Sequence, residues 1–93
     1  MSRISRAYPG KNAAEIYQRV HLVMAEVAET FSLDYRTDGA ARSGTVSRMG
    51  ISGAYQVRDG EVVLDVKFPM LIPGPMRRKV EDDIQRRLDG LFA

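Results

Sequence analysis

Residues 51–68 read ISGAYQVRDGEVVLDVKF, and the expected fold can be worked out from this stretch. Polar and apolar residues alternate on both sides of Asp59-Gly60, and an Asp-Gly pair in such a setting is the strongest short-range signal of a β-hairpin. A two-residue turn there determines which residues face each other across the two strands. The pairs expected on the buried face are Val57–Val62, Tyr55–Leu64, Gly53–Val66 and Ile51–Phe68.

The other face of this hairpin is mostly polar. A slip of one residue would move Asp65 and Lys67 into the core, so the register is well specified. The alternation predicts an antiparallel sheet with one face buried and the other in water. The pairs expected on the wet face are Arg58–Glu61, Gln56–Val63, Ala54–Asp65 and Ser52–Lys67.

Shorter strands are expected before the hairpin, at residues 33–36 and 45–48. The segment between them is rich in turn-forming residues, and Gly50 lets the chain turn before residue 51. Residues 2–7 could add an edge strand to the same sheet.

One amphipathic helix is expected on each side of these strands. Asn12, followed three residues later by Glu15, is typical of a helix N-cap. Pro75 suits the first turn of the second helix, and Gly90 suits its end. Each helix has one apolar stripe at a period near 3.6 residues. The stripes are Ile16, Val20, Val23, Val27 and Phe31 in the first helix, and Met76, Val80, Ile84, Leu88 and Leu91 in the second.

These elements predict an α+β fold in a single domain, residues 1–93. The expected element order is α-β-β-β-β-α, with an antiparallel sheet of about four strands. Each helix has one apolar stripe and the sheet has one apolar face. A two-layer arrangement with the N- and C-terminal helices on the same face of the sheet therefore buries all three.

Composition excludes several classes of protein. The chain has no cysteine, so disulfides and thiolate chemistry are absent. No apolar run approaches the roughly 18 residues that span a bilayer. The first residues have charge but no apolar segment behind them, so we see no secretory signal. We therefore expect a cytoplasmic protein with no membrane span.

No residue pattern indicates catalysis. His21 is the single histidine, and no cysteine, second histidine or adjacent carboxylate motif supplies it with partners. Ser43, Ser47 and Ser52 lack the setting of a nucleophile elbow, and no phosphate-binding glycine motif opens a helix. We expect no enzyme, no metal and no cofactor.

The acidic run at residues 81–83 could be imagined as a cation site. Neighbouring residues on a helix point in different directions, however, and a solvated face is the simpler interpretation. Ion pairs are instead expected at a spacing of four: Arg78–Asp82, Lys79–Asp83, Asp82–Arg86 and Asp83–Arg87.

Three stretches together resemble a known family. They are residues 50–53 at the entry to the hairpin, the alternating strand 62–66, and the apolar loop 68–72 followed by the closing helix with Ile84, Leu88 and Leu91. The chain resembles the polyhydroxyalkanoic acid system (granule-region) family, small bacterial proteins often encoded beside genes for polyester storage granules. The resemblance implies a setting in polyhydroxyalkanoate granule biology; it implies no catalytic mechanism.

The loop Met70-Leu71-Ile72 is the candidate interaction site. Three consecutive apolar residues between prolines must either tuck under the helices, as a lid on the core, or remain exposed as an adhesive patch. We hypothesise that this loop contributes to an interface. The expected partners are a second copy of the chain in a homodimer, the polymer granule surface, or granule proteins.

The wet sheet face is a second candidate surface. Arg36, Arg48, Arg58 and Lys67 are expected on or near it and could follow a phosphate backbone. Sheets that bind RNA usually add exposed aromatic residues, whereas Tyr55 is expected to face inward. The leading prediction is therefore a non-enzymatic accessory or interaction protein, and the alternative is a nucleic-acid-binding module that uses a basic sheet face.

Overall fold

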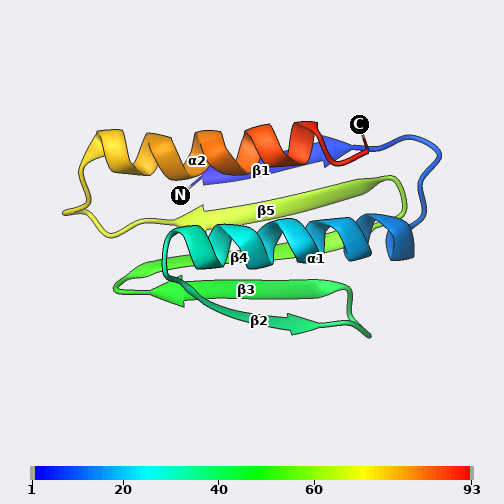
Figure 1. The fold of residues 1–93 in the computed structure, drawn as a ribbon, viewed down its shortest axis with the longest axis horizontal. Helices are drawn as coiled ribbons and strands as arrows, with labels where there is room; N and C mark the ends of the chain where they lie inside the picture. The colour runs from blue at the N-terminus through cyan, green and yellow to red at the C-terminus, as the bar shows by residue number, and fades with distance from the viewer. Residues whose placement is uncertain (1, 93) are drawn as a thin grey trace.

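The computed structural model describes residues 2–92, which form a five-stranded antiparallel sheet and two helices (Figure 1). The strands lie in the order β1-β5-β4-β3-β2. The α+β prediction is confirmed, and the strand beyond the expected four is the segment 2–7. The elements are β1 (Ser2–Ala7), α1 (Ala13–Thr30), β2 (Asp34–Asp38), β3 (Ser43–Arg48), β4 (Ile51–Arg58), β5 (Glu61–Lys67) and α2 (Gly74–Asp89).

The β4–β5 hairpin has the register expected from the sequence. Its ladder runs from Arg58 opposite Glu61 to Ser52 opposite Lys67. The predicted pair of Ile51 with Phe68 lies outside the ladder, because β5 ends at Lys67. Alternate residues are buried on one face only, and these are Gly53, Tyr55, Val57, Val62, Leu64 and Val66.

The tip of this hairpin is bonded to the segment that leads into α1. Asp59 Oδ1 accepts a hydrogen bond from the backbone N–H of Ala13 at 2.7 Å. The backbone N–H of Gly60 donates to the carbonyl of Lys11 at 2.9 Å, and the N–H of Tyr8 donates to the carbonyl of Gly60 at 2.7 Å. The start of α1 is therefore fixed to the hairpin.

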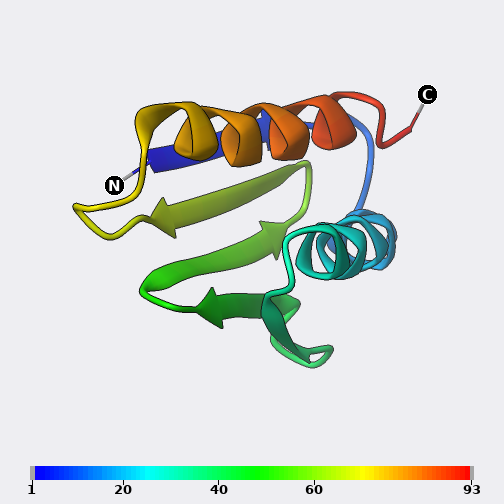
Figure 2. The same ribbon diagram turned by 60° about the vertical axis from the view of Figure 1, so that its left-hand side comes forward.

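Both helices cover the same face of the sheet, as predicted (Figure 2). The predicted N-cap of α1 is confirmed, since the backbone N–H of Glu15 donates to Asn12 Oδ1 at 2.9 Å. The helix ends at Thr30, so Phe31 is the C-cap, and its ring is only partly buried. The most deeply buried side chains are Ile16, Met24, Leu64, Leu88, Val20, Val27 and Val62.

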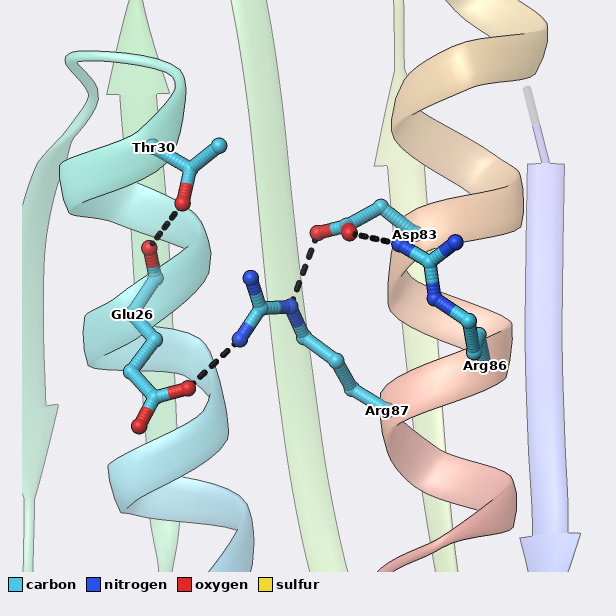
Figure 3. Close-up of polar contacts among 5 residues, drawn as sticks. All are labelled: Glu26, Thr30, Asp83, Arg86 and Arg87. Atoms are coloured by element: carbon cyan, nitrogen blue, oxygen red, sulfur yellow. Dashed lines mark hydrogen bonds and ion pairs between the residues drawn. The ribbon is translucent and has the colours of Figure 1, made fainter.

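Arg87 joins the two helices (Figure 3). Its Nε donates to Asp83 Oδ2 at 2.9 Å, and its Nη1 donates to Glu26 Oε2 of α1 at 2.5 Å. Arg86 Nη2 donates to the other oxygen of Asp83 at 2.6 Å. Of the four ion pairs expected in α2, only Asp83–Arg87 forms among the residues described. The prediction of the other three is wrong. Asp83 pairs with Arg86 instead of Lys79, and Arg86 is thereby not paired with Asp82. Nothing in the structure explains why Arg78 and Asp82 do not pair.

Gly44 of β3 lies directly against the ring of Tyr55 in β4. A Cβ atom at Gly44 would be 2.5 Å from Cε2 of Tyr55 and 2.8 Å from both Cζ and Oη. The ring cannot easily move aside, because the side chain is buried and its hydroxyl is hydrogen-bonded to that of Tyr35. Glycine at position 44 therefore makes room for the buried tyrosine.

The substitution Gly44→Ala should destabilise the protein by about 1–3 kcal/mol, the usual cost of overpacking a core. Urea denaturation followed by circular dichroism measures the change. Gly90→Ala is the matched control, because its Cβ would be 3.8 Å from the nearest atom and the backbone φ is −93°. Equal midpoints for Gly44→Ala and the wild type would contradict the packing described here.

Candidate functional site

Exposed apolar side chains gather at one end of the molecule. Among the residues described, five large apolar side chains are exposed, and four of these belong to the β3–β4 turn, the β5–α2 loop and the start of α2. Figure 1 shows the turn and the loop at the same end of the sheet, on the left. We call this group the apolar end; its residues are Met49, Met70, Leu71 and Met76, with Ile72 partly buried beside them.

The β5–α2 loop exposes its apolar residues almost completely. Met70 is 100% exposed and Leu71 is 96% exposed. Pro69 and Ile72 are partly buried, and the N–H of Ile72 donates to the carbonyl of Pro69 at 3.1 Å. The interpretation of residues 70–72 as a lid on the core is therefore wrong for Met70 and Leu71 and holds only in part for Ile72.

The β3–β4 turn adds Met49, which the sequence analysis missed. Met49 and Gly50 have φ angles of 51° and 88° and connect the paired residues Arg48 and Ile51, as in a type I′ hairpin. A methionine with positive φ is strained by about 1–2 kcal/mol, and here its side chain is 86% exposed. An apolar residue directly before the glycine of a two-residue turn is the signal that could have found it.

The turn and the loop are in contact. A Cβ atom on Gly50 would lie only 3.2 Å from Cβ of Pro69. A shallow groove beside them runs toward the end of α1, and it is lined by Phe31, Ser32, Leu33, Arg48, Met49, Ile51 and Met76. The apolar end is therefore one continuous surface built from two parts of the chain that are distant in sequence, the β3–β4 turn and residues 70–76.

The open sheet face is not uniformly basic. Arg36, Arg58 and Lys67 lie on it, whereas Arg48 follows the buried Val46 by two residues and lies on the face that carries the helices. The acids on the open face are Asp34, Asp38, Glu61 and Asp65, so positive and negative charges alternate across it. No strand residue on this face is aromatic within the described chain, so base stacking has no platform there.

His21 has partners that the sequence analysis did not find. Its Nδ1 is 3.0 Å from the hydroxyl of Tyr35, and its ring stacks between those of Tyr17 and Tyr35. Tyr35 is in turn bonded to the hydroxyl of Tyr55 at 2.6 Å, and Tyr17 to Thr37 at 2.5 Å. The spacing of Tyr17 and His21 by four on one helix was the available signal. The hydroxyl groups of these residues are therefore hydrogen-bonded to one another or to His21. The bonds connect α1 to β2, and β2 to β4.

Two tyrosines have perturbed acidity. Burial raises the pKa of Tyr55 well above its ordinary value, and its hydrogen bond with Tyr35 acts in the same direction. Burial also raises the pKa of Tyr8 to about 12. Tyr8 donates its hydroxyl to the carbonyl of Leu88 at 2.6 Å. In both cases the neutral hydroxyl is the form that the fold accommodates.

The interpretation of the acidic run at residues 81–83 as a solvated face holds for Asp82 but is wrong for Asp83, which is buried. Glu81 accepts the hydroxyl of Ser2 at 2.6 Å, and Asp83 is bound by Arg86 and Arg87. Within residues 2–92 no group of three or more His, Asp or Glu side chains could hold a metal ion. Neither helix in this part of the chain is long and apolar enough to cross a membrane.

Comparison with known proteins gives the family. A family model described as "putative polyhydroxyalkanoic acid system protein" matches residues 9–92. The chain belongs to this family. The match confirms the resemblance found in the sequence, and it spans every element of this polyhydroxyalkanoic acid system protein except β1. A search of curated proteins found no match.

The stability of this family member should begin to fall above about pH 9 and fall further as the pH rises toward 12. An unfolded tyrosine has a pKa near 10. Above that pH the folded state holds the protons of Tyr8 and Tyr55 while the unfolded state releases them, so unfolding becomes easier. Urea midpoints between pH 8 and pH 11.5 measure this, and Tyr8→Phe should make the decline less steep. Midpoints that stay constant to pH 11.5 would show that neither hydroxyl is perturbed.

Proposed function

We propose that this protein is a non-enzymatic accessory protein that binds the surface of polyhydroxyalkanoate storage granules through its apolar end. The observation that supports the proposal is the concentration of exposed apolar side chains at one end of a member of the polyhydroxyalkanoic acid system family. Met70 and Leu71 are the most exposed of them. Large exposed apolar patches on soluble proteins usually mark interaction sites.

The energetics of the apolar end favour docking. Covering a fully exposed leucine or methionine stabilises a complex by about 1.5–3 kcal/mol. Most of this stabilisation is still available from Met49, Met70 and Leu71, because each side chain is at least 86% exposed before binding. An aliphatic polyester offers a surface that can cover all three side chains without any matching hydrogen-bond pattern.

The polar residues support a binding role rather than a catalytic one. His21, Tyr35 and Tyr55 are bonded to one another, and Asp83 is bonded to two arginines. General acid–base catalysis needs a group that can exchange a proton with a substrate. The hydrogen bonds of these side chains instead connect elements of the fold.

Self-association is part of the same proposal. Two copies that cover each other's Met70 and Leu71 would form a homodimer in the absence of polymer. Granule binding and dimerisation would then compete for one surface, and adding polymer should shift the protein from dimer to bound monomer.

The double substitution Met70→Gln/Leu71→Gln should weaken binding to nanoparticles of a bare aliphatic polyhydroxyalkanoate at least tenfold. Co-sedimentation at increasing particle concentration measures the affinity. Leu22→Gln on α1 is the matched control, because Leu22 is 63% exposed and lies away from the apolar end. The control should bind like the wild type.

Because Met70 and Leu71 make little contact with the core, the double variant should keep the unfolding midpoint of the wild type. Wild-type binding by the double variant, or equal losses in the double variant and Leu22→Gln, would contradict the proposal.

A further inference from the structure

A cluster of cations borders the apolar end. Arg77, Arg78 and Lys79 directly follow Met76 in α2, and all three are exposed. None of them forms an ion pair with another residue of the described chain within 4.0 Å. We call these three residues the basic collar.

The collar is positioned against the loop. The guanidinium of Arg77 lies over the ring of Phe68, with Cζ 5.3 Å from the ring centroid. Phe68 directly precedes Pro69 and the exposed Met70, so Arg77 is held next to the apolar loop. Arg78 and Lys79 line the groove between the start of α2 and the end of α1. The groove is also lined by Thr30, Phe31, Pro75, Asp82, Asp83 and Arg86, so its charge is mixed toward the middle of α2.

The two stretches of the chain that include the residues of the apolar end contain no acid. Between Asp65 and Glu81 the chain has Lys67, Arg77, Arg78 and Lys79 but no carboxylate, and between Asp38 and Asp59 it has three arginines and no carboxylate. All 12 acidic residues lie outside these segments. The acids nearest to the collar in sequence are Glu81, which binds Ser2, and Asp82.

We infer that the apolar end and the basic collar together form a docking surface for an anionic lipid layer. The apolar side chains of the loop and turn would enter the acyl region, while the collar would contact the negative headgroups. This division of roles is the one used by peripheral proteins that combine buried apolar area with electrostatic attraction. The inference rests on the proposed function, because it assigns a second component to the surface that the apolar end contacts.

Charge complementarity distinguishes a lipid layer from bare polymer. An uncharged polyester can make favourable contacts only with the apolar residues. It offers no anionic group to pair with the three cations of the collar. Anionic headgroups supply that partner at the edge of the apolar region. A nucleic acid would supply phosphates but would leave Met70 and Leu71 in water, so it fits only half of the surface.

The test is binding of the full chain to vesicles by co-sedimentation. One set of vesicles contains 30% phosphatidylglycerol in phosphatidylcholine, and the other contains phosphatidylcholine alone. The wild type should bind the anionic vesicles, and 0.5 M salt should weaken that binding because it screens the charges. Arg77→Gln/Arg78→Gln/Lys79→Gln should weaken it about 100-fold, since each cation near an anionic surface contributes about fivefold.

The matched control is Arg36→Gln/Arg42→Gln/Arg58→Gln, which removes the same charge from residues outside the apolar end. It should bind anionic vesicles within a few-fold of the wild type. The collar variant should still bind bare polymer particles like the wild type, and Met70→Gln/Leu71→Gln should bind neither vesicles nor particles.

The lipid inference is overturned if anionic and neutral vesicles bind equally, or if the two triple variants lose affinity equally. It is also overturned if the collar variant loses affinity only for single-stranded RNA or duplex DNA while no vesicle binds; that result would identify the collar as a nucleic-acid contact. Normal binding to bare polymer without binding to any vesicle would overturn the lipid inference and leave the proposed function standing.

Discussion

Burial of one face of the β4–β5 hairpin beneath two helices is the constraint on which the rest of the structure depends. The alternation around Asp59-Gly60 gives the hairpin one apolar face, and a shift of a single residue would bury Asp65 and Lys67. The tip of the hairpin is also hydrogen-bonded to the residues that begin α1. The hairpin therefore positions the start of this helix relative to the sheet. The face of the sheet away from the helices carries mostly small, polar and charged residues, which are in contact with water.

This arrangement explains why the molecule has an apolar end. The core is filled by side chains from the strands and from the inner faces of the two helices, and α2 starts only at Gly74. The chain must therefore pass from the end of β5 to α2 around the end of the sheet. The prolines at positions 69 and 73 keep this passage non-helical, and Met70 and Leu71 form a turn within it. Met70 and Leu71 lie in the middle of this passage, where no core surface remains to cover them.

The parts of the fold that the sequence predicts well are those determined by local patterns. The hairpin register, the N-cap at Asn12 and most of the two helical stripes follow from residues close together in the chain. Met76 is an exception, because it was expected in the apolar stripe of the second helix and is 49% exposed. Pairing of β1 with β5 joins residues about 60 positions apart, so only a possible edge strand could be expected. The ion pairs of α2 were largely mispredicted, because exposed pairs at a spacing of four differ little in energy from their alternatives.

The same limit applies to the candidate site: local patterns single out some of its residues but do not predict their exposure or their contacts. Met70, Leu71 and Ile72 stand out as a run between prolines, but their exposure depends on how much of the core other segments fill. Met49 joins them only because the β3–β4 turn meets Pro69 in space. The hydrogen-bond partner of His21 is Tyr35 of β2, which reaches α1 only after the sheet has formed. Contacts of this kind depend on tertiary packing, which local patterns do not encode.

The most direct test of this account is the solvent exposure of the methionine methyl groups, measured by NMR as relaxation enhancement from a soluble gadolinium chelate. The account predicts strong enhancement for Met49 and Met70, an intermediate value for Met76, and almost none for Met24, which lies on the buried face of α1 and is 1% exposed. Protection of Met70 to the level of Met24 would contradict it, because the loop would then belong to the core.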